Sequence, residues 1–279
     1  MTGSLVVAGS DLRQPGAVAY VYAFERETGA VRWRADAGPG AATDLAIAGS
    51  LIYAVTLADE LLALDVETGN RVWSFSTGAA NEAFLLTSSP AVADGRVVFG
   101  GLDGVLYALD ATSGKLLWKS QLGGRISAGV LIAAGSVYAG TSERRLYRVR
   151  SDSGEVQASV ETVEASPSGR LALADGGVLA FLGERALACY TPALDRMRWS
   201  RTGTHPWSSS RPYVARGIAL AGSETGELVG LSLADGNVVW AENVGGTIRG
   251  IGATANGLYV GTLKGEVYAL PWPDPVGLR

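Results

Sequence analysis

The stretch from Asp103 to Trp118, DGVLYALDATSGKLLW, alternates its side chains with a period of two. One face would carry Leu106, Ala108 and Asp110, and the other Val105, Tyr107 and Leu109. This pattern predicts a strand. The next residues predict a tight turn, because Asp and Thr side chains bind nearby backbone and Gly114 can adopt a positive φ. A second predicted strand follows the turn and carries Trp118 near its start.

The same hairpin is repeated along the chain. Close copies run over residues 22–33 (YAFERETGAVRW), 62–73 (LALDVETGNRVW) and 229–240 (VGLSLADGNVVW). Two copies are degenerate. Residues 147–158 keep Gly154 but end on Ala158, and residues 188–199 keep the Trp but place Asp195 where the glycine is expected. We expect Asp195 to be a mild change, because Asp tolerates the left-handed conformation better than most residues.

The ends of these hairpins are evenly spaced. The positions are Trp33, Trp73, Trp118, Ala158, Trp199 and Trp240, separated by 40, 45, 40, 41 and 41 residues. A period near 40 with strand-only content is typical of a β-propeller. One repeat alone exposes an apolar face that its neighbours cover, so we expect residues 1–279 to form a single domain with a Pro-rich tail over residues 270–279.

Each predicted blade consists of four antiparallel strands, which we call A, B, C and D. Seven B strands are predicted at residues 4–9, 51–56, 97–102, 136–141, 178–183, 218–223 and 258–263. Six A strands are predicted at residues 44–48, 88–93, 127–133, 170–174, 211–215 and 249–253. The predicted fold is therefore an all-β, seven-bladed propeller in which the first blade lacks strand A and the last lacks strand D. Either the natural chain extends upstream of Met1, or the ring closes with two three-stranded blades.

Composition narrows the function classes. The net charge of -4 argues against nucleic acid as a partner. Cys189 is the only cysteine, so no internal disulfide can form, and its strand position predicts a buried side chain. No apolar run is long enough for a membrane helix, and the first residues have no signal-peptide pattern. We expect a monomer that is cytoplasmic or is the excised soluble part of an extracytoplasmic protein.

Residues 63–73 and 108–118 resemble the Ala-x-Asp-x-x-Thr-Gly-Lys-x-x-Trp repeat of the pyrroloquinoline-quinone-like (PQQ-like) propeller superfamily. The resemblance extends over nearly the whole chain. It implies that the repeat tryptophans dock against neighbouring blades, which makes them structural anchors: Trp33, Trp73, Trp118, Trp199 and Trp240.

The superfamily contains enzymes and non-catalytic members. Quinoprotein dehydrogenases carry PQQ and Ca²⁺ in a much longer, eight-bladed ring with a vicinal cysteine pair, and this chain has one cysteine. The sequence is more similar to the non-catalytic members, which include BamB-type assembly lipoproteins and the propeller domains of bacterial Ser/Thr kinases. It departs from the BamB type in its predicted blade number and in lacking an export signal.

Chemistry-bearing residues are few. His205 is the only histidine and lies in a predicted loop, with no Gly-x-Ser-x-Gly motif elsewhere. One His and one Cys are too few for a zinc site. We therefore expect no catalytic residue and no metal.

The loops that lead into the A strands offer the best candidate site, because such loops converge at one mouth of a propeller channel. They carry Asn81, Glu82, Arg125, Glu164, His205, Trp207 and Arg249. Arg125 and Arg249 follow similar Gly-Gly turns and should point at the same mouth. Two arginines, an aromatic ring and a histidine would suit an anionic planar ligand such as a quinone carboxylate. The alternative is that these are solvated rim residues.

The sequence thus predicts a non-enzymatic propeller that binds a protein segment or a small anionic ligand as a scaffold or sensor module, without a cofactor. Two alternatives remain open. One is a PQQ-binding quinoprotein oxidoreductase, and the other is the sensor domain of a bacterial Ser/Thr kinase.

Overall fold

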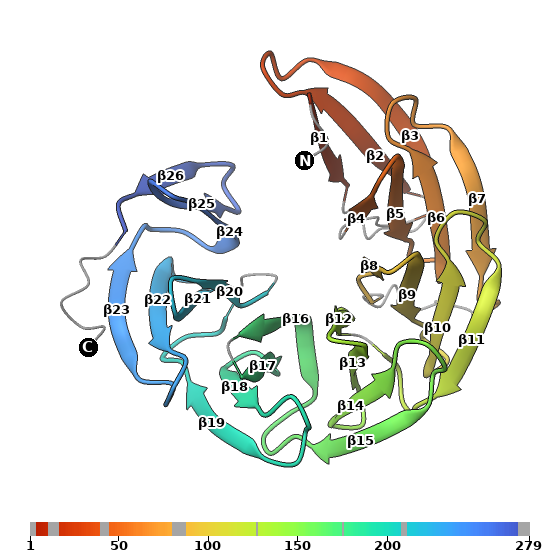
Figure 1. The fold of residues 1–279 in the computed structure, drawn as a ribbon. Helices are drawn as coiled ribbons and strands as arrows, with labels where there is room; N and C mark the ends of the chain where they lie inside the picture. The colour runs from red at the N-terminus through yellow and green to blue at the C-terminus, as the bar shows by residue number, and fades with distance from the viewer. Residues whose placement is uncertain are drawn as a thin grey trace. The chain divides into compact units, whose positions relative to one another are not determined.

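The computed structural model describes residues 4–10, 17–39, 45–79, 88–126, 128–174, 176–207 and 211–272. The regular elements in these ranges are 26 β-strands (Figure 1). They form seven antiparallel sheets, and within each sheet the strands neighbour one another in sequence order. The first and last sheets have three strands and the others have four. The predicted fold class is therefore confirmed for the described chain, including the missing A strand at the start and the missing D strand at the end.

The chain forms two compact units, which are described in turn. Unit 1 comprises Met1–Glu143 and Val149–Gln157, and unit 2 comprises Arg144–Arg148 and Ala158–Arg279.

Unit 1 contains the first three sheets. The first is β1 (Leu5–Gly9), β2 (Val18–Glu25) and β3 (Val31–Pro39). The second is β4 (Leu45–Ala48), β5 (Leu51–Val55), β6 (Glu60–Asp65) and β7 (Arg71–Ser76). The third is β8 (Ala91–Ala93), β9 (Arg96–Gly100), β10 (Val105–Asp110) and β11 (Leu116–Gln121).

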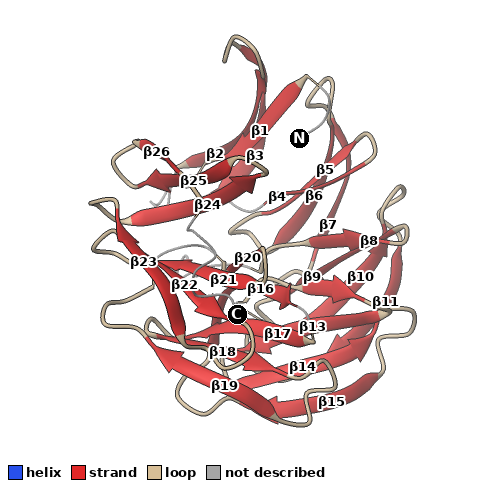
Figure 2. Ribbon diagram, turned by 60° about the vertical axis from the view of Figure 1, so that its left-hand side comes forward, coloured by secondary structure: helices blue, strands red, loops and turns tan. Residues whose placement is uncertain are grey.

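The fourth sheet is β12 (Leu131–Ala133), β13 (Ser136–Thr141), β14 (Arg145–Arg150) and β15 (Val156–Glu161), and its last two strands contain residues of both units. Unit 2 holds the other three sheets (Figure 2). They are β16 (Pro167–Ala174), β17 (Gly177–Leu182), β18 (Ala186–Tyr190) and β19 (Met197–Thr202); β20 (Tyr213–Ala215), β21 (Ile218–Gly222), β22 (Glu227–Ser232) and β23 (Val238–Asn243); and β24 (Ile248–Thr254), β25 (Gly257–Thr262) and β26 (Val267–Leu270).

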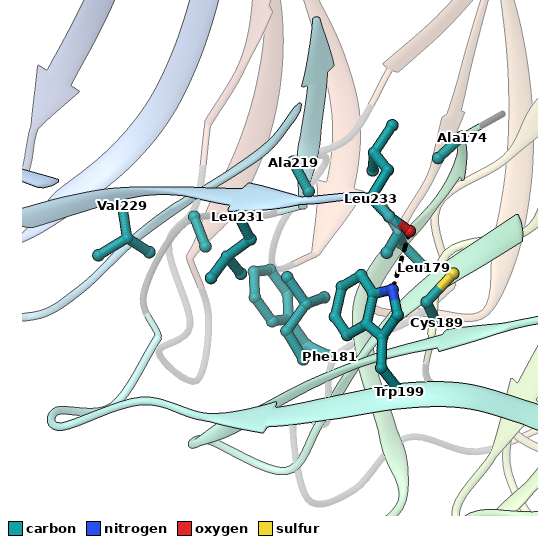
Figure 3. Packing of buried hydrophobic residues seen from close by; sticks show 11 residues of the cluster. Ala174, Leu179, Phe181, Cys189, Trp199, Ala219, Val229, Leu231 and Leu233 are labelled. Carbon is teal, nitrogen blue, oxygen red and sulfur yellow. Dashed lines mark hydrogen bonds between the residues drawn. The ribbon is translucent and has the colours of Figure 1, made fainter. Parts of the chain in front are cut away.

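Buried clusters join consecutive sheets within each unit. In unit 2, Phe181 and Trp199 of one sheet pack with Leu231 of the next, as Figure 3 shows. In unit 1, Tyr53 and Leu61 pack with Phe99 in the same way. The alternation predicted from the sequence explains these contacts, because each strand sends every second side chain to the same face.

The repeat tryptophans dock as the resemblance implied. In four of the five, the indole Nε1 donates to a backbone carbonyl at the C–D turn of the following sheet: Trp33 to Val66 at 3.0 Å, Trp73 to Ala111 at 3.1 Å, Trp118 to Ser151 at 3.0 Å and Trp199 to Leu233 at 2.9 Å (Figure 3 shows the last). The fifth, Trp240, packs against the buried cluster of the last two sheets. The turn glycine lies directly under the ring. A methyl group added to Gly69 would come within 2.6 Å of Trp33.

The turn at Asp195 differs from the prediction. Asp195 does not take the left-handed conformation, which belongs to Leu194 with φ 56°. The reason is a tighter turn: Leu194 N donates to Thr191 O three residues back, whereas Gly69 N donates to Asp65 O four residues back. In the other repeats, the tryptophan of the preceding sheet packs on the turn glycine. The corresponding position before this turn is Ala158, which has no indole, so a glycine is not required there.

Candidate functional site

Four of the predicted site residues, Arg125, Glu164, His205 and Trp207, lie where the chain passes from strand D into strand A, and a repeated backbone contact aligns three of these segments. Ser142 N donates to Arg125 O at 2.8 Å, Glu224 N to Pro206 O at 3.0 Å and Leu263 N to Thr247 O at 2.8 Å. Thr247 therefore occupies the position of Arg125. Arg249 lies two residues further on, inside β24, so the two arginines are not equivalent as the Gly-Gly turns had suggested.

Arg125 is half-buried in unit 1. Its backbone N donates to Ser142 Oγ at 3.0 Å, which fixes the loop against the B–C turn of its own sheet. Its side-chain Nε is buried and has no hydrogen-bond partner among the described residues. Since an unpaired buried donor is costly, this guanidinium is a candidate anion-binding group.

Trp207 in unit 2 is partly buried, packs against a core cluster and occupies the place of Ile126 and Ile248 in the other segments. Its N donates to Glu184 O at 2.6 Å, and its ring lies 6.3 Å from that of Phe181, centroid to centroid. A methyl group added to Gly203 would come within 2.6 Å of it. Its Nε1 is buried and has no partner among the described residues.

The sequence contained a signal for this role of Trp207. Ile126, Trp207 and Ile248 each follow a repeat tryptophan by eight residues, after Trp118, Trp199 and Trp240. An apolar residue at that fixed distance indicates a packed position rather than an open rim.

His205 lines a pocket of about 320 Å³ in unit 2. The other lining residues are Thr225, Glu227, Ala241, Glu242 and Asn243. His205 Nδ1 lies 3.8 Å from Glu227 Oε2, and Thr204 Oγ1 donates to the same oxygen at 2.9 Å. The lining contains two carboxylates and no Lys or Arg, so the pocket can accept hydrogen-bond donors and cationic groups better than the anion that was predicted.

The remaining predicted residues are scattered. Glu164 is exposed, and its charge adds to the effect of burial in raising the pKa of Tyr190 to about 12. Arg249 is exposed as well. Asn81 and Glu82 lie outside the described residues. Arg125 belongs to unit 1, whereas Glu164, His205, Trp207 and Arg249 belong to unit 2, so their convergence at one mouth stays a prediction.

An acidic pair in unit 1 was not anticipated. Asp59 is fully buried; its Oδ2 accepts from Thr77 Oγ1 at 2.5 Å and Leu102 N at 3.2 Å, and its Oδ1 has no partner in the described chain. Burial, and to a smaller extent the nearby Asp103, raise the pKa of Asp59, while the two hydrogen bonds lower it. Asp103 Oδ2 in turn accepts from Tyr107 Oη at 2.5 Å.

The sequence signal for Asp59 is its place in the repeat, where other sheets have a glycine. Asp59 has φ 55° and occupies the B–C turn position that Gly104 and Gly226 occupy in other sheets. A buried carboxyl group at a glycine position is a feature that strand periodicity cannot reveal.

The described residues show neither a metal cluster nor a membrane-spanning helix. They contain no group of three or more His, Cys, Asp or Glu side chains arranged to hold a metal ion. They also contain no helix long and apolar enough to cross a membrane.

Comparison with known proteins places the chain among PQQ-repeat propellers. BamB of Yersinia pestis is 25% identical over 190 residues, covering 62% of this chain and 48% of that protein. Quinohemoprotein alcohol dehydrogenase ADH IIB of Pseudomonas putida is 30% identical over 105 residues, covering 36% of this chain and 15% of that protein. The chain thus spans about half the length of the former and a small part of the latter.

A solved structure supports the fold assignment. The crystal structure of BamB from Moraxella catarrhalis superposes with a TM-score of 0.75 at 19% identity, covering 92% of this chain and 82% of that one. The family model described as outer membrane protein assembly factor BamB matches residues 1–167 and 142–272. These two ranges contain nearly all of the described strands, including those that make the Trp–Gly contacts of the repeat. The chain therefore belongs to the BamB-like PQQ-repeat propeller family.

Proposed function

We propose that this protein is a non-catalytic propeller that binds a protein partner through its last sheet. The observation that carries the proposal is the apolar surface of that sheet, where Tyr259, Leu263 and Val267 are 43%, 64% and 73% exposed. Exposed apolar residues that neighbour one another on the surface are typical of protein interaction sites. Family membership supports the proposal, because relatives over most of the chain are named as assembly factors.

The aspartates that recur at the C–D turns of the repeat stabilise those turns, which agrees with this proposal. Asp65 Oδ1 accepts from Thr68 N at 2.9 Å, from Thr68 Oγ1 at 2.8 Å and from Glu67 N at 3.1 Å, so this carboxylate closes its turn. Asp110 does the same for Ser113 and Thr112.

Site-specific photo-crosslinking in the host cell tests the proposal. A photoreactive residue at Leu263 or Tyr259 should give a discrete crosslinked protein. The matched control is the same residue at Val156, which is 44% exposed on β15. Crosslinks that are absent at all three positions, or equal at all three, would overturn the proposal.

A PQQ-binding function is the second candidate, and the unpartnered Nε of Arg125 favours it. A guanidinium is suited to a quinone carboxylate, and PQQ when bound would supply redox chemistry. The packed ring of Trp207 gives this candidate no stacking surface. Titration with PQQ, with and without Ca²⁺, should give saturable quenching of tryptophan fluorescence that Arg125→Ala abolishes; no quenching at high micromolar PQQ would remove this candidate.

A further inference from the structure

The pocket beside His205 lies where its loop departs from the repeat. In the segments that lead into β12 and β24, strand A is preceded by two glycines with positive φ, at residues 123–124 and 245–246. The corresponding residues before β20 are Thr204 and His205, and neither has a positive φ. The loop at His205 therefore follows a different path from the two glycine loops.

The side chain that faces this loop also differs from its counterparts. In two sheets the B–C turn places a long side chain over the loop, because a methyl group added to Gly124 would come within 2.7 Å of Glu143 and one added to Gly246 within 3.9 Å of Lys264. The aligned backbone contacts put Thr225 at the same position of its turn. Thr225 is too short to cover its loop in this way.

The hydroxyl group of Thr225 is also held away from the loop. Its Oγ1 lies 3.1 Å from Ser223 Oγ, on its own turn. The space that a longer side chain occupies in the other two sheets is thus left open, as a hollow of about 320 Å³. We call this hollow the His205 pocket, and its lining residues are His205, Thr225, Glu227, Ala241, Glu242 and Asn243.

The His205 pocket carries negative charge. Glu227 is partly buried, and its Oε2 accepts from Thr204 Oγ1 at 2.9 Å and lies 3.8 Å from His205 Nδ1. The Glu242 carboxylate has no hydrogen-bond or ion-pair partner among the described residues. Two carboxylates and a single imidazole leave the pocket negative at neutral pH, and a partly buried carboxylate is screened less by water than an exposed one.

The volume and the surface of the pocket limit what can bind. A volume of about 320 Å³ is at the lower end of the range of small-molecule sites, so the pocket suits one compact group. Ala241 offers apolar surface to a short alkyl chain, and the carboxylates accept hydrogen bonds. Ammonium and guanidinium groups carry donors and no acceptor, which matches this lining.

We propose that the His205 pocket binds an ammonium or guanidinium group on a short alkyl chain, held by the carboxylates of Glu227 and Glu242. Two sources share this chemistry, namely a small organic cation and a lysine or arginine side chain of a protein. The pocket can bind such a group whether or not the last sheet binds a partner, so the proposal goes beyond the proposed function.

A protein source would fit the position of the pocket. Leu263, which belongs to the proposed interaction surface, donates from its N to Thr247 O at 2.8 Å. Thr247 Oγ1 in turn donates to Glu224 O at 2.9 Å, and Glu224 is the neighbour of Thr225 in the pocket wall. A partner that covers Leu263 could thus insert a basic side chain into the pocket.

The test uses the full chain and the proton NMR signal of its only histidine, because the His205 ring reports on the pocket directly. The probe is ethylguanidine at constant pH and ionic strength, and N-ethylurea is the neutral match of the same shape. We expect a saturable shift with ethylguanidine, with a Kd of about 1–10 mM for a ligand of so few atoms, and none with N-ethylurea. Equal shifts with both probes, or no saturation with ethylguanidine, would overturn the proposal.

Variants test whether the departure from the repeat makes the site. Thr225→Lys copies Lys264 of the last sheet and supplies an ammonium group from the chain itself, so saturable binding should be lost, whereas Thr225→Ser should bind like the parent. Glu242→Gln should weaken binding by about fivefold, as for a partly solvated ion pair. Glu155→Gln, which removes the same charge from unit 1, should leave the affinity unchanged. Unchanged affinity in folded Thr225→Lys or Glu242→Gln would contradict the proposal.

The photo-crosslinking experiment distinguishes the two sources. Loss of the crosslink at Leu263 in the Glu242→Gln chain would assign the cation to the protein partner. A crosslink that persists in this variant, while ethylguanidine binds more weakly, would assign it to a small molecule. If ethylguanidine does not bind but the crosslink forms, only the pocket proposal fails; if ethylguanidine binds and no crosslink forms, only the proposed function fails.

Discussion

At the scale of single residues, the turn glycines and the repeat tryptophans form a recurring packing contact between neighbouring sheets. The indole lies so close to the glycine that a side chain has no room, and the glycine also has a positive φ, as at Gly154 with φ 77°. Where the tryptophan is absent, at Ala158, the following turn has no glycine either. At these four contacts the indole therefore packs on a turn that has room for glycine alone.

This pairing can be tested in the fourth sheet. Gly154→Ala would place its methyl group 2.7 Å from Trp118, whereas Gly135→Ala, with φ 72°, would meet no atom within 4 Å. We expect Gly135→Ala to cost about 1–2 kcal/mol for the left-handed conformation. Gly154→Ala should cost about 1–3 kcal/mol more because of overpacking. Urea unfolding measures both, and equal losses would show that the indole contact is unimportant.

Asp59 gives a prediction on pH dependence. Burial raises its pKa above the ordinary value of 3.8, so the folded state prefers the neutral acid. The stability that this preference contributes is complete below the unfolded-state pKa and is lost as the pH rises through the folded-state pKa. Asp59→Asn, which cannot ionise, should therefore gain stability relative to the parent chain as the pH is raised from 3 to 7.

Asp110→Asn serves as the control of opposite sign. Hydrogen bonds from Ser113 lower the pKa of Asp110, so its contribution is present at neutral pH and is lost as the pH falls. This variant should lose stability relative to the parent as the pH rises. Denaturant unfolding at several pH values checks both, and parallel profiles for the two variants would contradict the assignment.

At the scale of elements, most strands and their order followed from the sequence. Period-two alternation located β9, β10 and β11, and the spacing of the tryptophans set the blade number. The site was harder to predict. The sequence predicts Trp207 as a ligand-binding residue at the channel mouth, because aromatic rings in loops also bind ligands. Only the shared distance to Ile126 and Ile248 distinguishes the two roles, and no local pattern marks the burial of Asp59.

Trp118 joins two sheets of unit 1 and offers an element-scale prediction. It is 9% exposed, and its Nε1 donates to Ser151 O at 3.0 Å. Trp118→Ala should lower the free energy of unfolding by about 3–5 kcal/mol, as for other buried aromatic residues. Trp118→Phe keeps most of the apolar contact and loses the hydrogen bond, so it should cost less, with about 1 kcal/mol from the bond itself. Thermal and urea unfolding would reveal the order, which a solvent-exposed ring would not produce.

At the scale of the whole molecule, the division into two units raises the question of how the chain unfolds. The division passes through the fourth sheet, because β14 and β15 each contain residues of both units. Removing either unit would thus leave a sheet with incomplete strands and unpaired backbone groups, which is unfavourable. We predict that 1–279 unfolds as one cooperative domain, as the repeat pattern had suggested.

Hydrogen exchange followed by mass spectrometry at increasing denaturant can test this, with probes in each unit. Buried strands β5 and β6 report on unit 1, and β21 and β22 report on unit 2. A cooperative domain exposes all four strands at one midpoint, since coincident transitions at separate probes define two-state unfolding. Glu143 and Ala158 flank the boundary. If β21 and β22 became exposed at a lower midpoint than β5 and β6, the units would be independent domains, and a fragment beginning near Ala158 would then be expected to fold alone.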